Sequence, residues 1–462
     1  MATPPTITIS VDTDMSQATR GGGAFGFLNG IARNQYMLGD MWGLRPFLSK
    51  YGMSFTLQET SEILGNVSGG TRKGFEYDGL TTATLQMDTE RALGWHGGTF
   101  NASALQIHGR NLSADNLDSL QTASGIEADR ATRLWEVWYQ QKFLDEDRMD
   151  VKIGQQSLDQ EFMVSQNALL FVNTMFGWPM LPSADMPGGG PAYPLSAMGL
   201  RLRGKISNSV TVLAGVYKGS PSVDSGAADS QMDNANGLNF RLTGKPLAIA
   251  EIQYAYPSLG TTLYADQPEP LARSYKLGIW YDGRNFDDRR WDDTGLSQAN
   301  PATSGNPKQH RGNYAIYAVA DQMIWQQANE LDRTLNVFAR VMGTPLTDRN
   351  LVDFSANLGL TLREPFLNRD DDSFGVGIGY VHVSDRVAAL DKDTIAFAPG
   401  TYRPVRGSET FVEVTYQYAL APWWQLQPDV QYVFNPGAGV ADSTNQKVKN
   451  ETVLGLRTNI LF

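Results

Sequence analysis

Apolar and polar residues alternate along the last stretch of the chain, GLRTNILF, and along the residues just before it. One alternate set is mostly apolar: Leu454, Leu456, Thr458, Ile460 and Phe462. The other set is Gly455, Arg457, Asn459 and Leu461. A period of two places successive side chains on opposite faces of an extended chain, so the pattern predicts a β-strand with one apolar face.

The same alternation recurs in segments of roughly ten residues through the second half of the chain. Clear examples are DFSANLGLTL (353–362), FVEVTYQYAL (411–420) and WQLQPDVQYVF (424–434). A half-buried strand of a soluble sandwich or propeller would show the same period. We favour a transmembrane barrel because about a dozen such segments occur in series, match a tilted membrane-spanning strand in length and carry aromatic residues at their rims. Only a closed barrel satisfies all the backbone polar groups of such strands in lipid.

The connections between these segments alternate in length. Short polar turns are expected at 144–148, 206–210, 329–333, 363–371 and 420–423. Long connections are expected at 112–130, 159–195, 218–245, 282–310, 385–407 and 435–450. Outer-membrane barrels have short periplasmic turns and long external loops, so the alternation predicts this topology.

We count about seventeen strand candidates, whereas both ends on the periplasmic side require an even number. The segment GLNFRL (237–242) is the weakest, because Pro246 separates it from the better strand LAIAEIQYAY, and we assign it to an external loop. The prediction is an all-β fold, a transmembrane antiparallel barrel of about 16 strands over residues 51–462. Residues 1–50 are expected to form a partly irregular periplasmic segment. MATPPTITIS lacks the features of a signal peptide, so either the protein is not exported or a signal peptide has been removed. The barrel prediction requires the second.

Composition narrows the classes of function. The chain has no cysteine, which excludes disulfides, thiolate chemistry and Cys-ligated metals, and its net charge of −11 argues against a nucleic-acid partner. The four histidines, His96, His108, His310 and His382, lack the spacing of a metal site, and no G-x-S-x-G nucleophile elbow occurs. We expect no enzyme activity and no cofactor, with a lipase-like barrel enzyme as the alternative. The acidic runs at 287–295 and 369–372 could bind calcium, but solvated turns fit them better.

Strand parity identifies candidate residues of the lumen. The residues expected to point inward are Gln106, His108, Arg110, Glu136, Trp138, Gln140, Arg201, Arg203 and Lys205. Those expected to face lipid on the same segments are Leu105, Ile107, Trp135, Val137, Tyr139, Leu200 and Leu202. Each inward residue alone could be a solvated wall residue. Together, Arg donors beside acids and an inward Trp suit a sugar, because hydroxyl groups need paired donors and acceptors and pyranose faces stack on aromatic rings.

Residues 159–195 form the longest connection without a strand pattern. It is too apolar for disorder, and an outward apolar flap would be costly in water, so we predict a constriction loop folded into the lumen. The residues expected to narrow the lumen are Asn167, Phe171, Asn173 and Trp178. An external loop that packs on its neighbours is the alternative.

Several stretches closely resemble the carbohydrate-selective porins of Gram-negative bacteria, the OprB-type family. They are RLWEVWYQQ, KIGQQSLDQEF, NTMFGWPMLPSADMPGGGPAYPLSAMGLRLR, NVFARVMG, REPFLNRDDDSFGVGIGY and PWWQLQPDVQYVFNPG. The resemblance covers about residue 50 to Phe462. It implies a sixteen-stranded outer-membrane barrel that passes glucose and related monosaccharides by diffusion, with Trp178 in a pore-narrowing loop and Arg201 and Arg203 on the lumen.

The partners implied are monosaccharides, outer-membrane lipid and lipopolysaccharide, and the barrel-assembly machinery through Phe462. We expect a monomer, with a trimer as the alternative. A general diffusion porin without sugar preference would share the same barrel, and the sequence does not separate the two.

Overall fold

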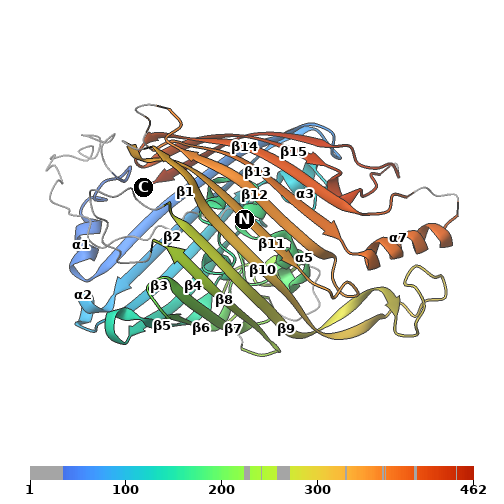
Figure 1. The fold of residues 1–462 in the computed structure, drawn as a ribbon, viewed down its shortest axis with the longest axis horizontal. Coiled ribbons are helices and arrows are strands. Elements are labelled where there is room, and N and C mark those ends of the chain that lie inside the picture. The colour runs from blue at the N-terminus through green and yellow to red at the C-terminus, as the bar shows by residue number, and fades with distance from the viewer. Residues whose placement is uncertain are drawn as a thin grey trace.

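Sixteen antiparallel strands form one closed barrel in this computed structural model (Figure 1). The structure describes residues 35–222, 229–240, 242–257, 271–327, 330–366, 369, 371–399, 403–443 and 445–462. Each strand pairs with the next one in the chain, and β1 pairs with β16 to close the ring. The predicted fold class and strand number are confirmed. In the described part of the chain, none of the helices has the length and apolar character needed to cross a membrane.

The strands are β1 Met53–Ser68, β2 Gly74–Asp88, β3 Gly98–Gly109, β4 Ala131–Phe143, β5 Met149–Gln156, β6 Ala197–Lys205, β7 Val210–Lys218, β8 Pro246–Tyr256, β9 Arg273–Asp292, β10 Pro307–Gln327, β11 Glu330–Gly343, β12 Val352–Arg363, β13 Ser373–Val383, β14 Ser408–Ala421, β15 Trp424–Phe434 and β16 Glu451–Leu461. The helices are α1 Leu44–Lys50, α2 Thr89–Leu93, α3 Leu112–Asn116, α4 Thr174–Gly177, α5 Met180–Asp185, α6 Ser230–Asp233 and α7 Asp385–Phe397.

The short turns and the long connections predicted from the sequence lie at opposite ends of the barrel, but the connection 257–272 at the first end and the connection 69–73 at the second depart from this pattern. The end with α1 and α2, at the left in Figure 1, carries the short connections and is called the turn end. The other end, with α7 at the right, carries the long connections and is called the loop end. One predicted boundary is wrong: most of the segment 282–310 is a hairpin, because β9 continues to Asp292 and β10 begins at Pro307, which leaves a loop of 293–306.

The weak strand candidate at 237–242 lies in a loop, as predicted, although its residue 241 lies outside the described residues. The preceding Asn236 accepts a hydrogen bond from the backbone N–H of Leu134 through its carbonyl oxygen at 3.0 Å. Leu134 is available because the pairing of β4 with β5 begins only at Val137 and Gln155. The loop therefore hydrogen-bonds to β4 at a position where β5 does not pair with it.

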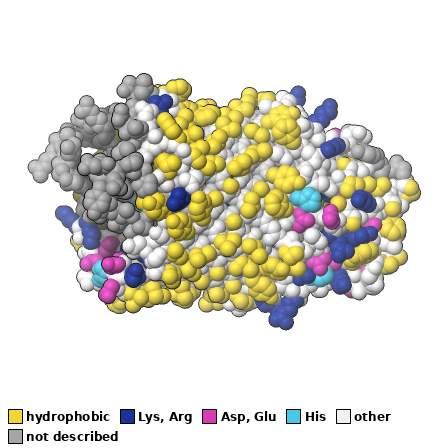
Figure 2. All heavy atoms as spheres, viewed as in Figure 1, with side chains coloured by type: hydrophobic (Ala, Val, Ile, Leu, Met, Phe, Trp, Pro, Cys, Tyr) yellow, Lys and Arg dark blue, Asp and Glu magenta, His cyan; other side chains and the backbone are white. Residues whose placement is uncertain are grey.

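On most strands the outward face is mainly apolar, whereas the inward face is polar except where it packs against the loops inside the barrel. On β12 the outward residues are Phe354, Ala356, Leu358, Leu360 and Leu362, and Leu358 is 50% exposed at mid-strand. Figure 2 shows that hydrophobic side chains gather along the middle of the face made by β9–β13, with many of the charged side chains in view toward the ends. The predicted parity is confirmed for β12, β14, β15 and β16. An exterior of this kind suits hydrocarbon rather than water.

The residues before β1 lie against the seam where the ring closes. The backbone N–H of Met37 donates to the carbonyl oxygen of Leu461 at 2.8 Å, and the guanidinium of Arg45 on α1 donates to the backbone oxygen of Phe462. Residues 35–50 therefore lie at the turn end. The rest of the predicted N-terminal segment, residues 1–34, is outside the described residues.

Residues 157–196, called the inner loop, fold inside the barrel and pack against its wall. Phe176 of the inner loop lies with its ring centroid 5.3 Å from that of Phe411 and 5.7 Å from that of Phe338. A Cβ atom at Gly377 of β13 would come within 2.5 Å of the Phe176 ring, so glycine is needed there for this approach. The predicted inward fold of this segment is confirmed.

Carboxylates on the inward faces of three strands accept hydrogen bonds from the backbone of the inner loop. The pairs are Glu251 of β8 with Met163 N at 2.9 Å, Asp321 of β10 with Asn167 N at 3.2 Å, and Glu413 of β14 with Val172 N at 2.6 Å and Asn173 N at 3.0 Å. Backbone N–H groups removed from water need such partners. The wall therefore provides the partners that a sheet would otherwise give this segment.

Arg340 of β11 donates hydrogen bonds to backbone carbonyl groups of the inner loop. Its Nη1 donates to the carbonyl oxygens of Met163 at 2.9 Å and Gly177 at 3.0 Å, and its Nη2 donates to that of Met175. The guanidinium also donates to Asn357 Oδ1 on β12. One buried side chain thus ties three points of the inner loop to the barrel wall.

A charged side chain introduced at mid-strand on the outward face should lower the stability of the folded protein in lipid. Leu358→Arg should destabilise the folded protein in lipid by about 2–4 kcal/mol, because the guanidinium would lie in hydrocarbon. Thr84→Arg, which points into the lumen, is the control and should cost much less. Urea unfolding in lipid vesicles would measure both, and equal losses of stability would contradict the assignment of faces.

The inner loop should be released when its carboxylate partner is removed. Glu413→Ala orphans the N–H groups of Val172 and Asn173, at about 1–3 kcal/mol for each donor left unsatisfied. Chymotrypsin should then cleave after Phe171 or Phe176, which are buried in the wild-type protein. Gln417→Ala, on the same face of β14 without a bond to the inner loop, should stay resistant. Cleavage mapped by mass spectrometry decides the matter, and a resistant Glu413→Ala protein would contradict the anchoring role.

Candidate functional site

The larger of two cavities described here inside the barrel has a volume of about 540 Å³ and lies on the turn-end side of the inner loop. Its wall comes from β1–β9 and from the inner loop. Side chains that could bind a polar solute there include Gln86, Asn101, Trp138, Gln140, Lys152, Gln160, Arg203, Gln253 and Lys276. The cavity therefore presents amides and cations around the indole of Trp138, and Trp135 also lines it.

Charged side chains of β5, β6 and the inner loop form a paired network in this wall. The Arg201 guanidinium contacts Asp150 and, through its Nε, lies 2.5 Å from Glu161 Oε2. Lys152 also pairs with Glu161, and the Nε of Arg203 lies 2.6 Å from Asp150 Oδ2. Arg201 is only 2% exposed, whereas 38% of the Arg203 side chain is exposed. Arg201 thus holds the network together, and Arg203 is the more accessible of the two arginines.

Glu136 and Trp138 point into the larger cavity, as predicted. Glu136 accepts a hydrogen bond from the backbone N–H of Ser157 at 2.8 Å and one from Trp138 Nε1 at 3.3 Å. The Nζ of Lys152 lies 4.6 Å from the centroid of the Trp138 ring. The carboxylate therefore fixes the first residue of the inner loop and the orientation of the indole together.

Trp135 was predicted to face lipid, and the structure shows that it points inward. The register of β4 against β3 shifts at this residue, so that Glu136 pairs with Ser103 and Leu134 with Ala104. Trp135 then packs edge-on against Tyr193 of the inner loop, with ring centroids 6.3 Å apart. The β-bulge changes the parity of β4 at this point.

The inward assignment of Gln106 and His108 is wrong. Leu105 and Ile107, only 1% and 3% exposed, are the inward residues of β3, and they pack with Tyr193 and neighbouring loop residues. The prediction failed because this part of the lumen is filled by loops and is not a wet bore. Gln106 and His108 consequently lie on the outer face of the barrel.

Two further cations of the predicted set also lie away from the cavities. Arg110 follows the end of β3, where Gly109 has a φ of 93°, and its side chain is 67% exposed at 3.9 Å from Glu76. It was predicted to face the lumen and instead lies at the loop-end rim. Lys205, at the turn end of β6, lines neither of the two lumen cavities described here.

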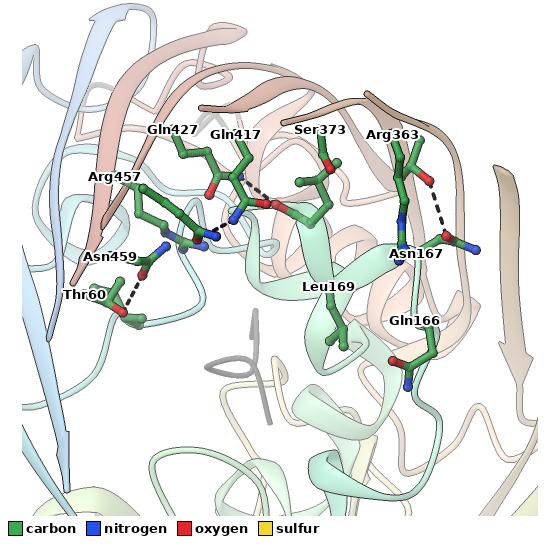
Figure 3. A pocket seen from close by; sticks show the side chains of 14 residues that line it. Thr60, Gln166, Asn167, Leu169, Arg363, Ser373, Gln417, Gln427, Arg457 and Asn459 are labelled. Atoms are coloured by element: carbon green, nitrogen blue, oxygen red, sulfur yellow. Dashed lines mark hydrogen bonds between the residues drawn. The ribbon is translucent and has the colours of Figure 1, made fainter. Parts of the chain in front are cut away.

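The inner loop borders a smaller cavity of about 210 Å³, shown in Figure 3. Asn167 lines it and is held by Asp321, whose Oδ1 accepts from the Asn167 side chain at 3.0 Å. Gln166 lines both cavities. In Figure 3, Gln166 and Leu169 lie across the space from Asn459 and Thr60. Residues 166–169, called the tip of the inner loop, thus separate the two cavities.

The other residues predicted to narrow the lumen are buried inside the loop packing. Phe171 and Trp178 are fully buried, and Trp178 Nε1 donates to the carbonyl oxygen of Gly189 at 2.8 Å. Asn173 donates to Gln431 Oε1 at 3.0 Å and accepts from the backbone N–H of Met175. These three side chains hold the inner loop in place, and none of them lines the cavities.

Sequence reasoning missed several residues of the two cavities, among them Lys152, Gln166 and Lys276. Lys152 and Lys276 alternate with outward Ile153 and Leu277, so strand parity could have identified both. Gln166 has no such signal, because it lies in a segment without a strand pattern.

The first acidic run covers the end of β9 and the turn after it, and Asp292 and Asp372 are both hydrogen-bonded locally. Asp292 accepts hydrogen bonds from the backbone N–H groups of Thr294, Leu296 and Ser304, and Asp372 pairs with Arg369. Within the described ranges, no group of three or more His, Cys, Asp or Glu side chains could hold a metal ion. Local hydrogen bonding and ion pairing therefore account for these carboxylates without a metal ion.

Comparison with known proteins gives a consistent result. The family model "Carbohydrate-selective porin, OprB family" matches residues 72–462. Porin B of Pseudomonas aeruginosa is 26% identical over 455 residues, covering 93% of this chain and 92% of that protein. The putative porin QuiX of Acinetobacter baylyi is 25% identical over 452 residues, covering 93% of each chain.

Among solved structures, the high pH structure of Pseudomonas putida OprB superimposes with a TM-score of 0.80 at 25% identity, covering 93% of this chain and 99% of that one. These similar proteins are named as porins, which are channels rather than enzymes. The family match extends from residue 72 to the last residue and so includes every strand of the barrel except β1. On this match the chain belongs to the OprB family of carbohydrate-selective porins, which reside in the outer membrane of Gram-negative bacteria.

Proposed function

We propose that this porin lets glucose and related monosaccharides diffuse passively across the outer membrane into the periplasm. The observation that carries the proposal is the placement of Trp138 in the larger cavity, among amide and cationic side chains. A sugar ring offers an apolar face for an indole and hydroxyl groups for donors and acceptors. A concave site with a few convergent polar groups is typical of small-molecule binding.

The charges in this wall favour a neutral solute. Lys152, Arg201 and Arg203 share the carboxylates Asp150 and Glu161, so most of the positive charge near Trp138 is compensated. Paired charges still offer oriented hydrogen bonds. They give an ionic solute little additional Coulomb attraction, which suits an uncharged sugar.

In this proposal the segment 159–195 is the constriction of the pore, with the barrel of residues 51–462 around it and residues 1–50 on the periplasmic side. The support is the anchoring of this segment across the lumen, from Glu251 of β8 to Glu413 of β14. A solute must pass beside the tip that carries Gln166 and Asn167. The channel needs no cofactor, because flux follows the gradient.

The experiment is sugar titration of single-channel conductance in planar bilayers. Glucose should block the ion current of the wild-type channel, whereas a general diffusion porin would show no saturable block. Trp138→Ala should raise the half-blocking glucose concentration by about 2- to 10-fold, the equivalent of about 0.5–1.5 kcal/mol of aromatic contact.

Tyr139→Ala is the matched control, because it removes the neighbouring aromatic on the same strand. The Tyr139 hydroxyl bonds to Gln141, and its side chain does not line the cavity. Its half-blocking concentration should stay at the wild-type value. Absence of glucose block in the wild-type channel would refute the sugar preference, and an unchanged block in Trp138→Ala would refute the role of this ring.

A further inference from the structure

The smaller cavity beside the tip of the inner loop contains a cation without a partner. Arg363, at the turn end of β12, lines this cavity, and its side chain is exposed. Within the described part of the chain, its guanidinium has no hydrogen-bond or ion-pair partner. In Figure 3 the Arg363 side chain extends toward Asn167 of the tip. An uncompensated positive charge that a solute can reach therefore faces this cavity.

No carboxylate lines the smaller cavity among the described residues. Arg457, the other cation of the lining, is already paired, because its Nε donates to the buried Glu62. Asp321 of β10 accepts from two backbone N–H groups of the tip and does not line the cavity. Asp372, in the turn after β12, pairs with the arginine of that turn. The charge of Arg363 thus has no acidic counterpart here.

The larger cavity differs in this respect. There Lys152, Arg201 and Arg203 share the carboxylates Asp150 and Glu161. The two cavities lie on different sides of the tip, so a solute meets a different balance of charge in each. A neutral sugar suits the larger cavity, whereas an anion gains Coulomb attraction in the smaller one.

Amide side chains near Arg363 have unused donors. Gln417 donates to Gln425 Oε1, and Thr60 donates to Asn459 Oδ1 at 2.7 Å. The amide nitrogens of Gln425 and Asn459 have no hydrogen bond among the described residues. A guanidinium binds a carboxylate through two parallel N–H donors, and amide groups bind hydroxyl groups. The cavity therefore offers both kinds of contact to one small solute.

We propose that the smaller cavity is a second solute site, which binds small hydroxy acids such as the acid form of a sugar. Arg363 binds the carboxylate in a bidentate manner, and the amide side chains around it bind the hydroxyl groups. This site is independent of the glucose preference proposed above, because the two cavities share only Gln166 among their described lining residues.

Gluconate and glucose are matched probes, because they have the same number of carbon atoms and differ mainly in the carboxylate. In planar bilayers, gluconate should block the potassium chloride current of the wild-type channel in a saturable manner. Arg363→Gln should raise the half-blocking gluconate concentration by about 10-fold, and much more than the half-blocking glucose concentration. Absence of saturable gluconate block in the wild-type channel would overturn the proposal.

Lys205→Gln is the matched control for charge. It removes one positive charge at the same end of the barrel, from a side chain that lines neither cavity. Its half-blocking gluconate concentration should stay at the wild-type value. Equal weakening of gluconate block in Lys205→Gln and Arg363→Gln would show that charge at the turn end in general attracts the anion, and would contradict a site at Arg363.

Two further measurements test the geometry and the class of solute. Arg363→Lys keeps the charge but loses the planar pair of donors, so its gluconate block should lie between those of the wild-type protein and Arg363→Gln. Acetate, a carboxylate without hydroxyl groups, should block much more weakly than gluconate. Equal block by acetate and gluconate would rule out a hydroxy-acid site.

The two proposals can fail separately. Gluconate block without glucose block in the wild-type channel would support the site at Arg363 and refute the glucose preference. Glucose block without gluconate block would do the reverse.

Discussion

The structure depends on the hydrogen bonds between inward carboxylates of the strands and the backbone of the inner loop. A segment of about forty residues inside a barrel has no neighbouring strand to satisfy its N–H and C=O groups, and such groups are costly when they lack partners. Glu251, Asp321 and Glu413 accept from its N–H groups, and Arg340 donates to its carbonyl groups. The wall is therefore a template for the loop as well as a lining for the pore.

This arrangement explains why acidic and basic side chains occupy an interior that is packed by the inner loop at the loop end. The aromatic residues of the inner loop pack against the wall, while the charged side chains fix the backbone between them. The lumen is consequently divided: the loop-end half is packed, and the cavities that could hold solute lie toward the turn end. The charge pairs around Arg201 belong to the boundary between the two regions.

The sequence predicts most of the barrel and only part of the site, for a physical reason. Lipid favours apolar side chains at most outward positions, so the alternation on β12 and β14–β16 can be recognised without the structure. Inward positions meet either water or packed loops, and the sequence pattern is the same in both cases. Leu105 and Ile107 face a loop-filled interior and were therefore assigned to the wrong side, while Trp135 changed face at a bulge that has no sequence signal. Phe171 and Trp178 were placed in the right loop, but burial within that loop depends on contacts from distant strands.

Gln166 borders both cavities, and this position has a kinetic consequence. Its backbone N–H is held by Asp321 at 3.3 Å, whereas its side chain is exposed. Exposed side chains change rotamer within picoseconds to nanoseconds. Between the two cavities, the backbone of Gln166 is therefore fixed while its side-chain amide changes orientation rapidly. A slowly diffusing solute experiences the average of these orientations.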